Sequence, residues 1–523
     1  MKNFNTFGVM IDMSRNAVMT VEALKQYLTL LGKMGYNAVM LYTEDTYEVD
    51  GEPYFGYMRG RYSKAEMKEI DDFCASIGME VIPCIETLAH LDTAFHWGKI
   101  PRDCENIMLV DDERTYELID RMFASTSECF RSRKINVGMD EAHMLGRGKY
   151  LDKHGYVPSN EILMRHLKRV CEIAKKYDYE LMVWSDMFFG DYSKKDIAEP
   201  DEEMQRLLDS VTPIYWDYHI TSEKEYSDKI IKHKQISKNT WYAGAAWGWF
   251  GIIPHNRFTL QTMIPAINAC KNNKVKNVFI TMWGDNGAEC SHISQLPALF
   301  YLAMHANGEN NEEKIKKKFK SLVGIEFDDF MKIDLPNDVE PYSGLPRNPS
   351  TYMIYSDYFN GFLDYTVKEG IGEKYHGIAE TLAAIAKKSR KYGYVFDSAA
   401  KLSYLLEVKY ELGVKTRRAY KDGDLEALKN LALNDYARVE KLLRDYVSAF
   451  EKQWMRENKP QGFDTHENRL GGILLRTSSC KRRILDYVSG KLDKIDELEE
   501  ELLPFGQKGK TMLYNGTFTP NWK

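Results

Sequence analysis

The chain alternates eight times between a short apolar run and an amphipathic stretch, from residue 6 to about residue 306. The apolar runs contain few polar residues, which is typical of parallel strands that helices cover on both faces. The predicted strands are Thr6–Asp12, Ala38–Tyr42, Glu80–Ile85, Lys134–Gly138, Glu180–Trp184, Val211–Trp216, Asn239–Ala246 and Asn277–Trp283. Eight strand–helix units of this kind predict a (β/α)8 TIM barrel.

Helix signals lie between these strands. The capping box Ser63-x-x-Glu66 precedes an apolar stripe that includes Met67 and Ile70, so a helix is expected to begin there. An open doubly wound sheet is the competing architecture. It is disfavoured because no Gly-x-Gly-x-x-Gly turn follows the first strand and the chain has no P-loop sequence.

The strand signal fades after about residue 308. Long amphipathic stretches follow and predict an all-α domain, at 376–391, 395–418, 424–453 and 473–501. We therefore expect a catalytic barrel over residues 1–308 and an α-helical C-terminal domain over 309–523. A polar segment from Glu457 to His466 interrupts the helices, and a loop of that length is either disordered or reaches an active site. A homodimer built by the helical domain is a further expectation.

The composition limits the class of partner and the compartment. A net charge of −6 with mixed acids and bases argues against a nucleic-acid surface. The first residues lack an apolar signal region, and no apolar run is long enough to span a bilayer. The 8 cysteines are scattered singly, as in a reduced cytoplasmic protein. The expectation is a cytoplasmic enzyme that acts on imported material.

Chemically capable side chains follow every predicted strand, at the end where active sites of parallel barrels form. They are Asp12, Arg15, Glu44, Asp45, Glu86, His90, Asp140, Glu141, Trp184, Asp186, Trp216, Asp217, Tyr218, Tyr242, Trp247, Trp283 and Asp285. Indoles stack on the C–H faces of a sugar ring, and carboxylates with an arginine bind its hydroxyls. The histidines are not at metal-ligand spacings. The pattern favours a sugar site without a metal or organic cofactor.

Asp140 and Glu141 are sequence neighbours at the end of the fourth predicted strand. Glycoside hydrolysis needs a carboxylic acid beside the leaving oxygen and a second group that stabilises the cationic centre. Neighbouring carboxyls cannot easily flank one bond from opposite faces. They fit better if the 2-acetamido carbonyl of the substrate attacks the anomeric carbon, while Asp140 accepts its N–H and Glu141 protonates the leaving oxygen. Burial and mutual repulsion are expected to separate their pKa values.

Two alternatives stay open at this point. The first is a retaining β-glycosidase with a protein carboxylate nucleophile on another strand, for which Glu86 and Asp285 are candidates. The second is a non-catalytic sugar-binding protein that has kept the pocket.

The motif Gly138-Met139-Asp140-Glu141 resembles the His-x-Gly-Gly-Asp-Glu motif of the family-20 β-N-acetylhexosaminidases. Asn136 stands in place of the histidine and Met139 in place of the second glycine. The segments Asp12-Met-Ser-Arg15 and Thr43-Glu44-Asp45 are also similar to family segments. The resemblance covers residues 6 to about 300 and is strongest to the cytoplasmic bacterial branch with a helical C-terminal domain.

The resemblance implies an exo-β-N-acetylhexosaminidase that releases terminal β-linked GlcNAc through an oxazoline, with retention, and GalNAc stays open as a second sugar. It implies that Arg15 grips the sugar, that Asp45, His90 and Glu141 form a relay, and that Asp285 binds sugar hydroxyls. It also implies an aromatic wall and a tyrosine that orients the acetamido group. The wall would comprise Trp184, Trp216 and Trp283, with Trp247 added; Glu44 would bind substrate; and the tyrosine would be either Tyr218 or Tyr242.

Overall fold

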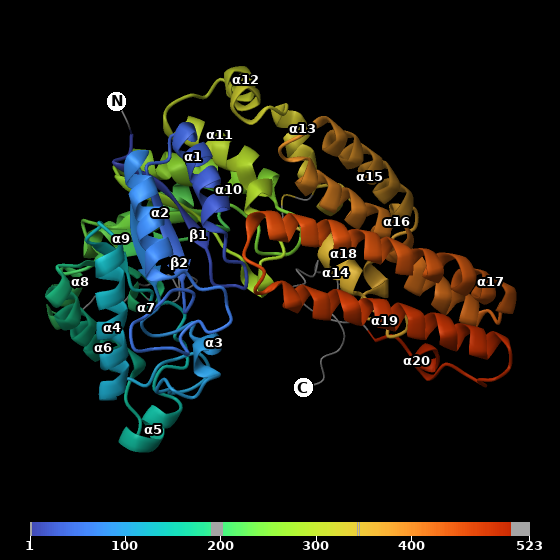
Figure 1. Ribbon diagram of the computed structural model, residues 1–523, viewed down its shortest axis with the longest axis horizontal. Coiled ribbons are helices and arrows are strands. Elements are labelled where there is room, and N and C mark those ends of the chain that lie inside the picture. The colour runs from blue at the N-terminus through green and yellow to red at the C-terminus, as the bar shows by residue number, and fades with distance from the viewer. Residues whose placement is uncertain (1–2, 190–201, 343, 345, 504–523) are drawn as a thin grey trace. The chain divides into compact units, whose positions relative to one another are not determined.

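The computed structural model describes residues 3–189, 202–342, 344 and 346–503 (Figure 1). Its eight strands form a closed barrel in chain order. All neighbouring strands are parallel, including the closing pair of β1 and β8. The predicted (β/α)8 fold is thereby confirmed. The strands are β1 Thr6–Asp12, β2 Ala38–Thr43, β3 Glu80–Ile85, β4 Lys134–Asn136, β5 Glu180–Trp184, β6 Thr212–Trp216, β7 Trp241–Ala245 and β8 Asn277–Met282.

The strands differ from the predicted ones mainly at their ends. The clearest case is β4, which ends at Asn136 and not at Gly138. Gly138 and Met139 have φ values of 71° and 72°, which are left-handed and incompatible with an extended strand. The chain therefore turns two residues earlier than its apolar sequence indicates.

Side chains along each strand alternate between the barrel interior and the surrounding helices. Met10, Tyr42 and Cys84 belong to the packed interior cluster. Two residues further along the same strands lie Asp12, Glu44 and Glu86. The same period of two that fills the core therefore brings three carboxyl groups to the carboxyl-terminal end of the barrel.

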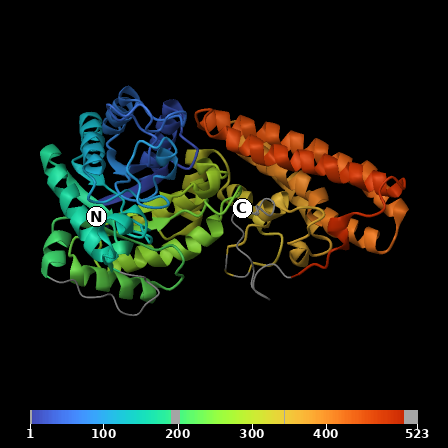
Figure 2. The same cartoon turned by 90° about the horizontal axis from the view of Figure 1, so that it is seen from below.

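The helices of the barrel begin and end where local signals favour it. Ser63 accepts the Glu66 N–H and the Glu66 side chain accepts the Ser63 N–H, which confirms the capping box. Figure 2 shows the helices of this unit arranged around the strands. They are α1 Val21–Met34, α2 Lys64–Ser76, α4 Glu113–Cys129, α6 Ser159–Ala174, α8 Glu202–Leu208, α9 Glu223–Ile236, α10 Asn256–Asn272 and α11 Leu296–Ala306. Short helices within the loops are α3 Asp92–Phe95, α5 Lys149–His154, α7 Asp186–Phe189 and the 3-10 turns Lys175–Tyr177, Asp285–Gly287 and His292–Gln295.

The chain separates into two compact units. The first, the barrel unit, contains residues 1–246, 259–283 and 298–311; the second, the helical unit, contains 247–258, 284–297 and 312–523. The segments that follow β7 and β8 thus group with the helical unit. The boundary predicted at residue 308 stays a prediction, and the ends of the two predicted domains, residues 1–2 and 504–523, lie outside the described residues.

The helical unit is built of long helices, as predicted. In both views α15 runs beside α16, and α18 beside α19 (Figures 1 and 2). The predicted helix over 424–453 contains one π-helical turn, Leu431–Tyr436. The helices are α12 Glu312–Val323, α13 Phe327–Met331, α14 Pro349–Tyr355, α15 Ile371–Lys388, α16 Gly393–Lys421, α17 Leu425–Asn430, α18 Ala437–Glu457, α19 Phe463–Val488 and α20 Asp496–Glu499, with 3-10 turns at Lys332–Asn337 and Asp364–Thr366.

The prediction of a long polar loop over 457–466 is wrong. Helix α18 ends at Glu457 and α19 begins at Phe463, so only residues 458–462 connect them. The buried Glu457 carboxylate accepts the Ser291 hydroxyl at 2.7 and 2.8 Å. Within α19, His466 Nε2 lies 2.8 Å from the Gly287 carbonyl oxygen. Polar residues that a sequence pattern assigns to solvent are here buried against partners far away in the chain.

All eight cysteines are free, and most are buried. Burial raises the pKa of the Cys74 thiol to about 12, which is typical of an unreactive core thiol. Within the described ranges, no helix combines the length and the apolar character that crossing a bilayer requires.

Glu457 offers a test of this packing through pH. Burial raises its pKa from 4.5 to about 7, although hydrogen bonds from Ser291 and Tyr394 oppose the shift. The folded state therefore holds this proton more tightly than the unfolded chain. The resulting stability is complete below pH 4.5 and is lost as the pH rises through 7. Between pH 5 and 8, wild type should lose about 1–3 kcal/mol more free energy of unfolding than Glu457→Gln.

Urea unfolding of the helical unit at both pH values measures this difference. The matched control is Glu451→Gln, an exposed position of the same helix, which should keep the wild-type pH dependence. If Glu457→Gln and wild type lose the same free energy, the Glu457 carboxyl does not titrate as described.

Candidate functional site

The loop after β4 holds Asp140 and Glu141 in a strained backbone. Gly138, Met139 and Glu141 have φ values of 71°, 72° and 52°, a region that residues with a side chain rarely adopt. The Glu141 N–H donates to Asp186 Oδ2 at 2.9 Å, so a side chain from α7 holds this turn in place. Asp140 is buried, whereas the Glu141 side chain is 48% exposed. The neighbouring carboxyls therefore have different surroundings.

His90 lies beside both carboxyls. Its Nε2 is 3.4 Å from Asp140 Oδ2 and 3.7 Å from Glu141 Oε2. Burial by itself lowers the pKa of His90, but the charges of Asp140 and Glu86 outweigh burial and raise that pKa to about 10. His90 is therefore protonated at neutral pH and places a positive charge next to the pair.

Glu86 lies beneath this group and is fully buried. Burial, together with the charge of Asp140, raises the pKa of Glu86 well above its ordinary value, so its neutral form is favoured. Within the described part of the chain neither carboxyl oxygen of Glu86 has a hydrogen-bond partner, and the same holds for Asp140 Oδ1 and the buried Trp184 Nε1. Buried polar atoms of this kind take their partners from water or from a bound polar molecule.

The predicted relay differs at its first link. Asp45 is buried and forms an ion pair with Arg59, whose Nε lies 3.2 Å from Asp45 Oδ1. The described ion pairs of His90 are those with Asp140 and Glu141. The structure thus brings His90 to Glu141, as predicted, but gives Asp45 a different partner.

Arg15 connects the ends of β1 and β2. Its Nη1 lies 3.0 Å from Asp12 Oδ2, and its Nε lies 3.3 Å from Glu44 Oε1. Burial raises the pKa of Glu44 to about 7, although Arg15 opposes the shift. The guanidinium also lies over the rings of Tyr42 and Trp283, at 4.7 and 5.1 Å from their centroids. Arg15 is therefore fixed between acidic and aromatic groups, as a sugar-binding arginine requires.

The aromatic wall comes from the ends of β6 and β8. Trp216 stacks on Tyr218 with ring centroids 5.3 Å apart, and Trp283 Nε1 donates to the Tyr218 hydroxyl at 3.0 Å. Trp216 and Trp283 are half-buried, so part of each ring is accessible. Trp184 is only 1% exposed and packs 6.0 Å from Trp283. It lies in the core beneath the wall and does not line an open surface.

The structure separates the two candidate tyrosines: Tyr242 packs away from the carboxyls, whereas Tyr218 contacts Trp216 and Trp283. Tyr242 follows Trp241, which points into the barrel core, and by alternation Tyr242 faces outward. Its hydroxyl donates to the Asp217 carbonyl at 2.8 Å, and its ring packs against Tyr226 of α9. Of the two predicted tyrosines, Tyr218 is therefore the one positioned at the aromatic wall.

Two predicted substrate-binding residues belong to the helical unit. Trp247 is 1% exposed and stacks on Trp249 at 4.3 Å, among Phe250 and Phe258. It is a core residue of an aromatic cluster, so the prediction that it lines the sugar pocket is wrong. Asp285 begins the 3-10 turn Asp285–Gly287 and is half-buried. Its role as a ligand of sugar hydroxyls stays a prediction.

Sequence reasoning placed Asp186 at a strand end but gave it no role. Its two oxygens accept the Glu141 N–H and, at 3.3 Å, the Trp216 indole N–H. Burial and the charge of Asp140 raise its pKa to about 7. The signal that identifies Asp186 is its inward position two residues beyond Trp184. Asp217, in contrast, pairs with Lys229 at 2.7 Å and serves the fold.

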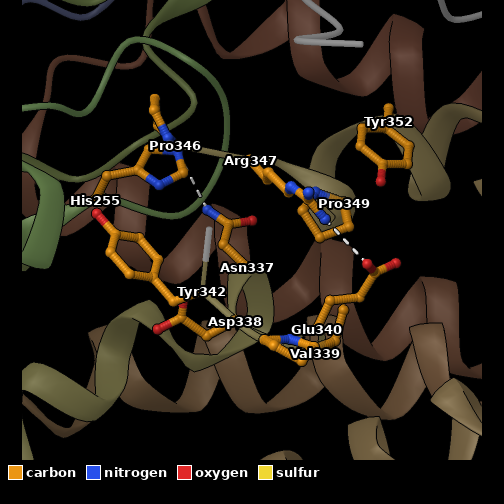
Figure 3. A pocket seen from close by; sticks show the side chains of 11 residues that line it. His255, Asn337, Asp338, Val339, Glu340, Tyr342, Pro346, Arg347, Pro349 and Tyr352 are labelled. Carbon is orange, nitrogen blue, oxygen red and sulfur yellow. Dashed lines mark hydrogen bonds and ion pairs between the residues drawn. The ribbon is translucent and has the colours of Figure 1, made fainter. Parts of the chain in front are cut away.

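A separate cavity of about 410 Å³, including its open mouth, lies within the helical unit (Figure 3). It is lined by His255, Asn337 and Tyr342, among other residues. Charged groups in its lining form ion pairs; Arg347, for example, pairs with Glu340 at 2.9 Å. Burial lowers the pKa of His255 to about 3, so that ring is neutral. This cavity has none of the uncompensated carboxyls of the barrel site.

Comparison with known proteins gives matches to a family model and to individual proteins. The Glycoside Hydrolase 20C C-terminal domain model matches residues 326–515. Human Hexosaminidase D is 23% identical over 342 residues, which cover 58% of this chain and 66% of that protein. Bovine Hexosaminidase D is 24% identical over 238 residues, covering 43% of this chain and 65% of that protein. The chain thus spans just under two thirds of the length of these relatives.

Solved structures of hexosaminidases also match. The GH20 exo β-N-acetylglucosaminidase of Vibrio harveyi has a TM-score of 0.48 at 12% identity, covering 63% of this chain and 59% of that one. The β-N-acetylhexosaminidase of Bacteroides fragilis has a TM-score of 0.48 at 17% identity, covering 61% of this chain and 70% of that one.

The close contact between Gly138 and Glu86 gives a testable consequence. A Cβ on Gly138 would lie 1.9 Å from Glu86 Oε2, and φ is +71°. Gly78 has nearly the same φ, +72°, but a Cβ added there would meet nothing within 4 Å, so Gly78→Ala isolates the backbone strain. We expect Gly78→Ala to cost about 1 kcal/mol of unfolding free energy and Gly138→Ala about 2–4 kcal/mol. Urea unfolding measures both, and equal losses would show that Glu86 does not press against this backbone.

Proposed function

Because the chain belongs to glycoside hydrolase family 20, as its barrel motifs predicted, we propose that it is an exo-β-N-acetylhexosaminidase. Its substrates are oligosaccharides or glycosides with a terminal non-reducing β-linked GlcNAc, and GalNAc is the second sugar to test. The observation that carries the proposal is the adjacent pair Asp140–Glu141, one carboxyl buried beside a protonated His90 and the other half-exposed.

The proposed mechanism uses the acetamido group of the substrate as the nucleophile. Asp140 accepts the acetamido N–H and orients its carbonyl oxygen toward the anomeric carbon. The half-exposed Glu141 protonates the departing oxygen and then activates the water that opens the oxazoline. Tyr218, stacked on Trp216, donates its hydroxyl to the acetamido oxygen. Because attack and hydrolysis both invert the anomeric centre, the product retains the β configuration.

The surrounding charges support this division of roles. The ion pair with His90 holds the Asp140 carboxylate in place, and this carboxylate stabilises the positive charge that develops on the acetamido nitrogen as the oxazoline forms. Asp186 holds the Glu141 backbone and the Trp216 indole with one carboxyl group. The acid and one side of the acetamido pocket are therefore positioned by the same side chain.

The alternatives have less support. Glu86 would be a poor nucleophile, because burial raises its pKa and favours the neutral acid. For a non-catalytic sugar-binding protein, the strained turn that presents Glu141 would have no chemical use.

We also propose residues 1–308 as the catalytic barrel and 309–523 as the helical domain, in a cytoplasmic protein that forms a homodimer. The free, buried cysteines are consistent with a reducing compartment. Sedimentation at several concentrations tests the dimer.

Variants of the two carboxyls test the mechanism. Glu141→Gln should slow hydrolysis of a methyl β-N-acetylglucosaminide by about 10²–10⁴-fold, because a poor leaving group needs the acid, and should affect a 4-nitrophenyl glycoside less. Asp140→Asn should slow both by about 10²–10³-fold, because acetamido attack displaces the leaving group in both substrates. Steady-state kcat and KM measure this, with the exposed Glu161→Gln as control. Nearly full activity of Asp140→Asn would refute the assisted mechanism.

The two tyrosines form a matched pair for a further test. Tyr218→Phe should lower kcat by about 10–100-fold and weaken binding of a thiazoline analogue of the cyclised intermediate. Tyr242→Phe should leave kcat/KM within about twofold and cost about 1 kcal/mol of stability, since its hydroxyl bonds groups of the fold, among them the Asp217 carbonyl and the Met263 sulfur. The reverse ranking of the two variants would exchange their roles.

A further inference from the structure

Three aromatic side chains form an exposed cluster on the loops that follow β2 and β3. The Tyr54 and Trp97 rings stack 5.6 Å apart, and the Tyr57 ring lies edge-on to Trp97 at 5.3 Å. Their exposed fractions are 43%, 47% and 40% for Tyr54, Tyr57 and Trp97. Next to them Met58 is 73% exposed with a φ of 63°. Exposed apolar side chains that gather in one place are typical of interaction sites.

The loop that carries the two tyrosines is held firmly. Between them, Phe55 is buried edge-on against Tyr47 at 5.4 Å. Arg61 Nη1 donates to the carbonyls of Pro53 and Phe55. Arg59, two residues beyond Tyr57, pairs with Asp45 and donates to the Ser14 carbonyl. The tyrosines are therefore fixed in exposed positions and do not collapse into the core.

The loop that carries Trp97 contacts the loop that carries Glu141, the proposed acid. The Trp97 loop also carries His90, seven residues before Trp97, and His90 contacts Glu141. Asp103 of the same loop accepts the N–H groups of Gly146 and Gly148, beyond Glu141 in the next loop. Figure 1 shows α3 and α5, which belong to these two loops, at the same end of the barrel unit.

The cluster lies across the barrel from Trp216 and Tyr218. Trp216 ends β6 and Tyr218 follows it, whereas the cluster follows β2 and β3, and in a closed eight-stranded barrel β6 lies opposite β2. In the proposed mechanism the leaving group lies at Glu141, which follows β4, and the loop that carries Trp97 contacts Glu141 through His90.

We propose that Tyr54, Tyr57 and Trp97 form the platform for the leaving group, and that its occupant is the second sugar ring of a β-linked oligosaccharide. This inference rests on the proposed function. It adds a substrate preference: oligosaccharides are hydrolysed with a higher kcat/KM than small glycosides. The rings offer apolar faces to the C–H groups of a pyranose, and the Lys99 ammonium, 5.6 Å from the Tyr54 ring centroid, is available for a hydroxyl.

Two substrates that differ only in the leaving group test the platform. For each enzyme form, kcat/KM is measured on N,N′-diacetylchitobiose, which leaves a sugar, and on the methyl β-glycoside of GlcNAc, which leaves methanol. We expect Trp97→Ala to lower the disaccharide-to-methyl ratio by about tenfold, since one stacking ring is lost. Trp97→Phe should restore most of that ratio. The control Ile231→Ala, an exposed apolar residue of α9, should leave both values at wild type.

Each outcome supports or refutes the proposed function or the proposed platform. If wild type cleaves neither glycoside, the proposed function fails and the platform fails with it. If wild type cleaves both and Trp97→Ala keeps the ratio, only the platform is refuted. If Trp97→Ala keeps the ratio but dissociates an oligomer in sedimentation, the cluster is an interface between copies of the chain and the platform is likewise refuted.

Discussion

The attraction between protonated His90 and buried Asp140, 3.4 Å apart, is the interaction on which the site depends. Asp140, Glu86 and Asp186 bring three carboxyl groups into one largely dry region, and three anions there would repel one another strongly. The structure resolves this with one ion pair and two carboxyls, Glu86 and Asp186, whose pKa values are raised. The negative groups around His90 stabilise its positive charge. Removing His90 would therefore disturb the carboxyls, and removing the carboxyls would disturb His90.

Asp186 connects the two halves of the barrel rim. The charged groups follow β1 to β4, and the accessible aromatic wall follows β6 and β8. Asp186, after β5, accepts one N–H from each half, that of Glu141 and that of Trp216. The strained turn at Glu141 is thereby fixed relative to the wall. Strain of this kind persists only when surrounding contacts over-determine it, and this bond is one of those contacts.

The barrel was predictable because parallel strands buried on both faces leave continuous apolar runs. The site was predictable where position alone decides: Asp12, Glu44 and Glu86 continue the inward period of their strands. The prediction of the site failed where a shift of one residue along a strand decides which side chain faces the core. Trp241 and Tyr242 are both aromatic, and the sequence does not tell which faces the core. The prediction also failed for Trp247, which packs against Trp249 and Phe250 in the folded chain. It failed for residues 457–466 because Ser291 and Gly287, which bind Glu457 and His466, are far away in the sequence.

The helical unit explains why the segments after β7 and β8 have a fixed conformation. Asp334, in the turn that follows α13, accepts the Asn256 side chain at 2.8 Å and the Arg257 N–H at 2.9 Å. Ser291 and Gly287 are bound by Glu457 and His466. The segments 247–258 and 284–297 thus have their buried polar partners in the helical unit, and without them those groups would need water. The fold of segments 247–258 and 284–297 therefore depends on contacts within the helical unit to which they belong.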